Sequence, residues 1–225
     1  MPIFWCRTDP WLAAPSVAAQ FCARAGIAAQ DFFHTQELVL HAAGRFLLEL
    51  GFRSYQPGCP LPPLCRTPDG KPHFPGGQPT FSISHAGAVV VCAFSEEEIG
   101  IDVEQVTAVE PSLLSVLQPE ELAYLRQFPQ AGQARTFYHL WTQKESLIKA
   151  RGGVLADIFR RESVISPELQ WKDRLDGFFL RRPSFPEPEY VLAVSAKAEE
   201  SPVITCLELP HSTDQLLGAL HWDRA

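Results

Sequence analysis

The residues best suited to chemistry are two carboxylic acids that alternate with aliphatic residues in Gly100–Glu104, directly after an apolar run. Side chains of a strand alternate between its two faces, so Asp102 and Glu104 point to one side and Ile101 and Val103 to the other. Hard cations such as Mg²⁺ bind carboxylate oxygens in a fixed geometry. The stretch therefore predicts half of a metal site, and the alternative is an exposed edge strand with a polar face.

A third acid lies near the end of a segment with helical periodicity, residues 134–150. Glu145 and Lys149 are four residues apart, so both project from one helix face, in line with Phe137 and Trp141. Such a pair on an exposed helix contributes little. Because this pair continues an aromatic ridge, we expect part-burial, in which case the acid requires an ion pair or a bound charged ligand.

Ser84 and His85 precede the apolar run 89–94, and both side chains are suited to holding phosphate oxygens. A serine next to a histidine is not by itself a catalytic dyad. Three glutamates at 96–98 mark a turn, and the acidic strand begins at Ile99. We expect the runs 89–94 and 99–104 to pair as a hairpin.

Two further basic residues, considered alone, have ordinary interpretations. Arg45 lies within a helical apolar stripe that ends near Gly51, where its charged head can reach water. Lys71 follows a turn in a loop rich in proline and glycine, and most loop lysines are solvated. Along the chain, helix is followed by strands twice, which predicts an α+β architecture in two lobes of similar size.

Composition narrows the function further. The chain has 225 residues, 46 % of them hydrophobic, and a net charge of −7, which argues against general nucleic-acid binding. Any phosphate-binding site must then be confined to a small part of the surface. The six cysteines show no metal-binding or disulfide-rich spacing, which predicts reduced thiols. The sequence shows no signal peptide and no apolar run long enough for a membrane span, so we expect a cytoplasmic protein.

Taken together, separated stretches resemble one family, the Sfp-type 4′-phosphopantetheinyl transferases of the holo-acyl/peptidyl carrier protein synthase superfamily. The similar stretches match in order and spacing over roughly residues 34–155. Each stretch alone is only a modest indication of the family, but the combination of all of them is specific. They are Gly70–Pro72, Phe81–His85, Gly100–Glu104 and Phe137–Ala150.

The resemblance implies a reaction, partners and a fold. Members transfer the 4′-phosphopantetheine arm of coenzyme A to a serine of an apo acyl or peptidyl carrier protein, with Mg²⁺, and release adenosine 3′,5′-bisphosphate. Their fold is a pseudo-dimer of two α+β lobes in one chain, which implies a monomer with its active site in the cleft between the lobes. We expect an N-terminal lobe at 1–105 and a C-terminal lobe at 106–225. Binding of nucleic acid or membrane is not expected.

The resemblance also implies residue roles. Asp102, Glu104 and Glu145 are the expected magnesium ligands, and Glu145 or Glu104 is the expected general base. Lys149 is expected to offset or protonate the departing oxygen. The expected contacts to the phosphates and adenosine of coenzyme A are Arg45, Lys71, Ser84, His85, Lys144 and Lys149.

This chain departs from the family at a few positions near these residues. Ser82 replaces a common Asn, Ala86 replaces a common Ser, and Val154 replaces a glycine in the loop after the helix. Because valine does not readily adopt positive φ, we expect that loop to be rearranged. Two other functions remain as alternatives. One is a different Mg²⁺-dependent phosphotransferase or phosphodiesterase that uses the same three carboxylates, and the other is an inactive carrier-binding relative.

Overall fold

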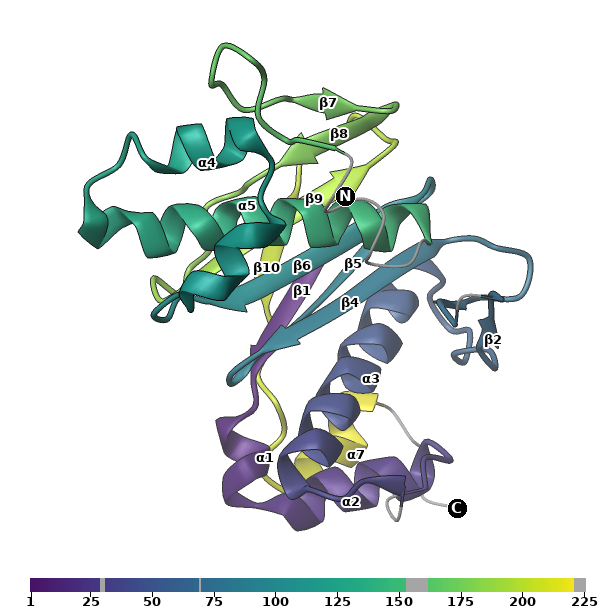
Figure 1. Cartoon of the computed structure of the whole chain (residues 1–225). Helices are drawn as coiled ribbons and strands as arrows, with labels where there is room; N and C mark the ends of the chain where they lie inside the picture. The colour runs from purple at the N-terminus through teal and green to yellow at the C-terminus, as the bar shows by residue number, and fades with distance from the viewer. Residues whose placement is uncertain (29–30, 69, 153–161, 221–225) are drawn as a thin grey trace.

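The computed structural model describes residues 1–28, 31–68, 70–152 and 162–220. Its helices and strands follow the order of the chain in Figure 1. In the first half they are β1 (Pro2–Arg7), α1 (Asp9–Ala13), α2 (Pro15–Arg24), α3 (Thr35–Tyr55), β2 (Cys65–Arg66), β3 (Pro72–His73), β4 (Thr80–Ala86), β5 (Val89–Ser95) and β6 (Ile99–Gln105). In the second half they are η2 (Pro111–Val116), α4 (Pro119–Leu125), α5 (Gln130–Arg151), β7 (Arg174–Leu175), β8 (Phe178–Arg181), β9 (Tyr190–Ala196), β10 (Val203–Cys206) and α7 (Thr213–Leu220).

Two four-stranded sheets form the centre of the molecule (Figure 1). Sheet one has the order β10-β1-β5-β4, in which β10 runs parallel to β1 and the other neighbours are antiparallel. Sheet two has the order β6-β9-β8-β7 and is antiparallel throughout. The sheets pack face to face through apolar residues of β1, β5, β6 and β9. Mixed helices and sheets confirm the α+β prediction.

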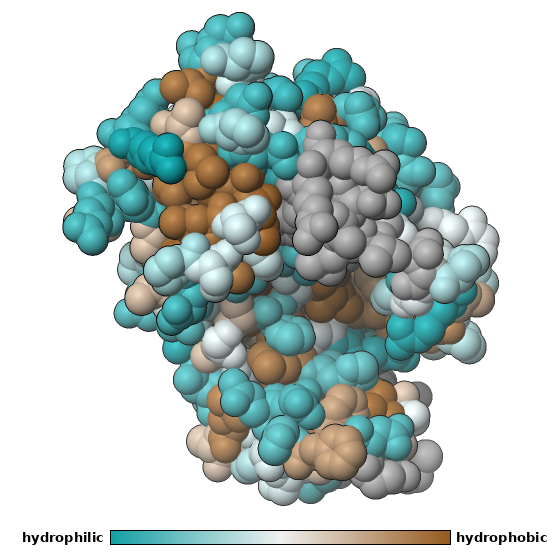
Figure 2. All heavy atoms as spheres, viewed as in Figure 1, coloured by the Kyte–Doolittle hydropathy of each residue, from teal (hydrophilic) through white to brown (hydrophobic). Residues whose placement is uncertain are grey.

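Helices cover the outer face of each sheet (Figure 1). The helices α4 and α5 pack with η2 on sheet two, over a separate apolar cluster that includes Leu140 and Leu147. Figure 2 shows a continuous hydrophobic area at the surface of this layer, over α4, η2 and α5. No helix among the described residues is long and apolar enough to cross a membrane.

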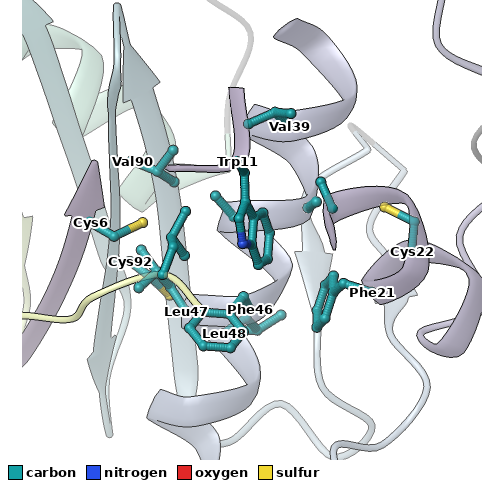
Figure 3. Packing of buried hydrophobic residues seen from close by; sticks show 14 of the residues in the cluster. Cys6, Trp11, Phe21, Cys22, Val39, Phe46, Leu47, Leu48, Val90 and Cys92 are labelled. Atoms are coloured by element: carbon teal, nitrogen blue, oxygen red, sulfur yellow. The ribbon is translucent and has the colours of Figure 1, made fainter. Parts of the chain in front are cut away.

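The helices α1, α2, α3 and α7 cover sheet one over the largest apolar cluster (Figure 3). Trp11, Phe21 and Phe46 form its aromatic centre, and each is at most 1 % exposed. Burying one such side chain contributes about 1.5–3 kcal/mol. Strand β5 serves both cores, because Cys92 packs under the helices and Val91 packs between the sheets. All six cysteines are free thiols.

The predicted hairpin between residues 89–94 and 99–104 is wrong. Strand β5 pairs with β4 and β1, whereas β6 pairs with β9 in the other sheet. The physical reason is that Ile99, Ile101 and Val103 pack against the inner face of β5, so the two strands meet face to face. The lobe boundary between residues 105 and 106 remains a prediction, and each sheet takes strands from both sides of it.

Candidate active site

Helix α5 and strand β6 approach each other at Gly100. A Cβ atom added there would lie 1.9 Å from the carbonyl oxygen of Ser146 and 2.3 Å from the backbone nitrogen of Ala150. Only glycine fits between two backbones at that spacing. The close approach places Glu145 and Lys149 of α5 beside the acids of β6.

Replacing Gly100 by alanine is expected to lower the free energy of unfolding by about 3 kcal/mol, because overpacking at a backbone contact forces the helix away from the sheet. Urea unfolding measures the change. Gly132→Ala is the matched control within α5, since a Cβ atom there would lie 3.8 Å from the Cβ of Phe128, an ordinary contact. Equal stability of Gly100→Ala and wild type would show that the contact does not hold α5 in place.

Asp102 is the centre of the charged network and is only 3 % exposed. Its Oδ1 atom accepts hydrogen bonds from Lys149 Nζ at 2.7 Å and from Ser84 Oγ at 2.8 Å. Lys149 Nζ also donates to Ser84 Oγ at 2.9 Å. The Oδ2 atom is buried and has no hydrogen-bond partner among the described residues. A buried carboxylate oxygen without a partner is costly unless it binds a ligand.

These residues line a cavity of about 270 Å³. Its walls come from β4 of sheet one, from β6 of sheet two and from α5. The lining residues are Ile83, Ser84, His85, Asp102, Glu104, Trp141, Glu145 and Lys149.

The acids of this cavity have unusual protonation equilibria. Burial, followed by the negative charge of Asp102, raises the pKa of Glu104 to about 7, although the charge of Lys149 and a hydrogen bond from Trp141 work against the rise. Burial and the charge of Asp102 likewise raise the pKa of Glu145 to about 7. Burial also raises the pKa of Asp102, although Lys149 opposes this shift. The site therefore contains more carboxylate charge than one ammonium compensates.

The carboxylates suit a hard divalent cation. Among the residues that the structure describes, no three His, Cys, Asp or Glu side chains are grouped closely enough to hold a metal ion. Nevertheless, Asp102 Oδ2 has no hydrogen-bond partner in the described part of the chain, and burial together with the negative charge of Asp102 raises the pKa values of Glu104 and Glu145. A cation bound to oxygen ligands would relieve both conditions, so this donor set fits Mg²⁺.

The unliganded protein is expected to melt at a lower temperature at about pH 8 than at about pH 5.5. Glu104 and Glu145 have pKa values of about 7 in the folded state, against an ordinary value of 4.5. The folded state therefore holds protons that the unfolded state has released, and this stabilisation is lost as the pH rises through about 7. Mg²⁺ should raise the melting temperature more at the higher pH.

Differential scanning fluorimetry over a pH series measures this effect. Glu145→Gln removes one of the titrating groups and should reduce the difference between the two pH values. An unchanged difference in that variant would contradict the assignment.

Two neighbouring cavities share lining residues with the first. One of about 320 Å³ includes Lys71, Glu145 and Lys149. The other, of about 590 Å³, includes Arg45 and His85. All three cavities include Ile83, so they lie along one edge of β4.

The 590 Å³ cavity combines apolar walls with basic groups. Arg45, Arg66, His41 and His85 line it, and the Arg45 Nε atom is buried without a hydrogen-bond partner among the described residues. Burial lowers the pKa of His41, and the charges of Arg45 and Arg66 lower it further. Burial followed by the charge of Lys149 lowers the pKa of His85. An anionic ligand in this cavity would be stabilised by these groups.

The structure brings most of the predicted site residues together. Ser84, His85, Asp102, Glu104, Glu145 and Lys149 line the 270 Å³ cavity, and Arg45 and Lys71 line the adjoining ones. The predicted part-burial of Glu145 is confirmed, since it is 8 % exposed. Sequence reasoning did not assign Trp141, His41 and Arg66 to the site. Of these residues, only Trp141 could have been found from the sequence, because it lies one helical turn before Glu145.

The prediction that Lys144 faces phosphate is wrong. Lys144 is fully buried, and its ammonium lies 2.9 Å from Glu121 Oε2. The same acid accepts hydrogen bonds from the backbone nitrogens of Gln118 and Val164. Lys144 therefore ties α5 to α4, and it lines none of the three cavities. The predicted loop rearrangement at Val154 lies outside the described residues.

A family model described as the 4′-phosphopantetheinyl transferase superfamily matches residues 98–199. This segment contains the acidic strand and the Glu145–Lys149 helix. The chain is therefore similar to this superfamily over residues 98–199, and the resemblance inferred from the sequence is confirmed.

Several curated proteins are similar to the chain. A 4′-phosphopantetheinyl transferase from Bacillus subtilis is 35 % identical over 139 residues, 56 % of this chain and 59 % of the relative. The transferase Sfp of Bacillus subtilis strain 168 is 38 % identical over 85 residues, 37 % of this chain and 38 % of the relative. AcpT of Salmonella typhi is 32 % identical over 135 residues, 56 % of this chain and 66 % of the relative. The matches thus span between about a third and two thirds of the relatives' length.

Proposed function

We propose that this protein transfers the 4′-phosphopantetheine arm of coenzyme A to a serine of an apo acyl or peptidyl carrier protein. The observation that carries the proposal is the convergence of three separate sequence motifs on one cavity. Ser84 and His85 come from β4, Asp102 and Glu104 from β6, and Glu145 and Lys149 from α5.

We infer that the two sheets and their helices correspond to the two lobes of a pseudo-dimer, with the active site between them. This inference is supported by the equal number of strands in the sheets and by the helix layer on each outer face. It is also supported by the cavity walls, which come from both sheets. The family resemblance further predicts a cytoplasmic monomer.

The residues divide into two binding functions. Asp102, Glu104 and Glu145 would hold Mg²⁺, which neutralises charge on the pyrophosphate of coenzyme A when it is bound. Ser84, His85 and Lys149 would donate hydrogen bonds to the phosphates. The adjoining 590 Å³ cavity, with Arg45 at its wall, would take the adenosine and its 3′-phosphate.

In the proposed reaction, the carrier serine oxygen forms a bond to the phosphorus on the pantetheine side of the pyrophosphate. The bond from that phosphorus to the bridging oxygen breaks, and adenosine 3′,5′-bisphosphate leaves. Lys149 stabilises the charge that develops on the leaving oxygen. The serine proton passes to Glu145 or Glu104, two carboxylates that line the cavity beside Lys149.

We also propose that the carrier docks on partly exposed apolar residues of η2 and α5, called here the docking patch and defined by Leu113, Leu114, Val116 and Trp141. Trp141 also lines the 270 Å³ cavity, so the patch adjoins the proposed reaction site. The chain has a net charge of −7, and apolar contact avoids repulsion from an acidic carrier.

Replacing Leu113, which is 37 % exposed, by glutamate is expected to raise the KM for the carrier about 10-fold. The KM for coenzyme A should stay unchanged, because Leu113 lines none of the three cavities. Val203→Glu is the matched control, an exposed apolar residue on β10. If Leu113→Glu and Val203→Glu have the same KM for the carrier, the carrier docks elsewhere.

The decisive experiment is the intact mass of an apo carrier protein after incubation with this protein, coenzyme A and Mg²⁺, with EDTA as control. A gain of one phosphopantetheine arm that EDTA suppresses would support the reaction and its metal dependence. Binding of coenzyme A without any gain across several carriers would favour an inactive relative. Absence of binding would favour a different Mg²⁺-dependent phosphotransferase or phosphodiesterase.

A further inference from the structure

The ammonium group of Lys71 contacts three backbone carbonyl oxygens. Its Nζ atom lies 2.6 Å from the carbonyl oxygen of Lys149, 3.2 Å from that of Ile99 and 3.5 Å from that of Ala150. An ammonium has three donors and no acceptor, so these three oxygens match its full capacity. Lys71 thus joins its own loop to the end of α5 and to the start of β6.

The end of α5 and the start of β6 both have backbone carbonyls that need a hydrogen-bond donor. The last four carbonyls of a helix have no partner within the helix, and their partial negative charge favours a cation. Helix α5 ends before Gly152, which has a φ of 69° and donates its backbone N–H to Ile148. Strand β6 is an edge strand of sheet two, so part of its backbone lacks a sheet partner. There, the N–H of Ile101 donates to Ser82 Oγ at 3.1 Å.

A tight turn fixes the position from which Lys71 reaches these carbonyls. The N–H of Lys71 donates to Thr67 Oγ1 at 3.0 Å, and the N–H of Thr67 donates to the Lys71 carbonyl at 2.9 Å. Gly70 adopts a φ of 85° within the turn. The Lys71 stem passes close to Gly152, where an added Cβ would lie 3.9 Å from the Lys71 Cδ.

We propose that Lys71 is a positioning residue that holds the C-terminal end of α5 against β6, so that Glu145 and Lys149 stay opposite Asp102. The inference rests on the proposed function and refines it. It replaces the expectation that the Lys71 ammonium binds a phosphate of coenzyme A, because its donors already meet three carbonyl oxygens. Lys71, Glu145 and Lys149 also line the same 320 Å³ cavity, so displacement of the helix end would alter the site directly.

The first test uses hydrogen exchange of the unliganded protein, which requires no activity. Lys71→Met keeps the apolar stem and removes the three donors. Backbone amides of residues 148–152 are expected to exchange about 10-fold faster in this variant, because charged hydrogen bonds at the helix end are lost. Lys172→Met is the matched control, since the Lys172 ammonium also donates to a backbone carbonyl, that of Ser163 at 2.9 Å. Unchanged exchange in Lys71→Met would overturn the proposal.

The second test separates positioning from phosphate binding. In Lys71→Met, kcat is expected to fall about 10-fold while the KM for coenzyme A changes less than about 3-fold. The preference for coenzyme A over 3′-dephospho-coenzyme A should equal that of wild type, and Lys71→Arg should restore most of kcat. A lost preference with normal kcat would identify Lys71 as a phosphate ligand and overturn the proposal. If wild type transfers no arm, the proposed function fails, and the exchange experiment still decides whether Lys71 holds α5.

Discussion

Replacing Asp102 by asparagine is expected to lower kcat for phosphopantetheine transfer at least about 100-fold, the loss typical for removal of one key electrostatic group. Asp102 Oδ1 binds both Lys149 and Ser84, and its buried Oδ2 has no hydrogen-bond partner within residues 1–28, 31–68, 70–152 and 162–220. Asparagine keeps the shape and one acceptor but removes the negative charge that binds a cation. The variant therefore loses both its metal ligand and the anion that orients Lys149.

The fold should survive this change. The Lys149 side chain is 31 % exposed, so water can solvate its ammonium when Asp102 is neutralised. Single-turnover transfer and Mg²⁺ titration measure the effect, and an unchanged circular dichroism spectrum shows that the fold is retained. Asp173→Asn is the control, because the Asp173 side chain is 86 % exposed. A variant with wild-type kcat and wild-type Mg²⁺ dependence would refute the metal assignment.

Replacing Lys149 by methionine is expected to reduce kcat by a similar factor, at least about 100-fold. The Lys149 ammonium bridges Asp102 and Ser84, and its charge lowers the pKa values of Asp102, Glu104 and Glu145. Without it, the three acids repel one another more strongly, and their pKa values rise further. The remaining activity of the variant should therefore need a higher pH than that of wild type, because the proposed general base loses its proton at a higher pH.

Measurement of kcat over a pH series gives the shift of the ascending limb of the pH–rate profile. Lys149→Arg keeps the positive charge and should restore the position of that limb, although the guanidinium geometry differs from that of an ammonium. Lys197→Met is the control, an exposed lysine that pairs with Glu98 on the surface. If Lys149→Met lowers kcat without any shift of the limb, Lys149 does not control the ionisation of these acids.

The local chemistry of the site was predictable from residue spacing. Alternation in β6 correctly separates Asp102 from Ile101 and Val103, which pack between the sheets. Spacing of four residues correctly places Glu145 and Lys149 on the same wall of a cavity. These predictions succeed because the periods of strand and helix are properties of the local backbone.

Long-range pairing was not predictable in the same way. The run 89–94 is apolar on both faces, and such a strand can accept a neighbour at either edge. Which strand it meets depends on sheet packing, and the structure pairs it with β1 and β4 rather than β6. Lys144 shows the same limit, since its partner Glu121 lies 23 residues away. A lysine that will be buried can be told from an exposed one only by identifying such an ion-pair partner.

Residue types and their local spacing are enough to identify the charged groups, the faces of β6 and α5 from which they project, and the resemblance to the phosphopantetheinyl transferases. Only the folded chain shows that β4, β6 and α5 meet at one cavity, that Lys144 lies in the core and that Lys71 binds the end of α5. The first set of features follows from local geometry and residue chemistry. The second depends on contacts between distant segments, such as the packing of Gly100 against Ser146 and Ala150.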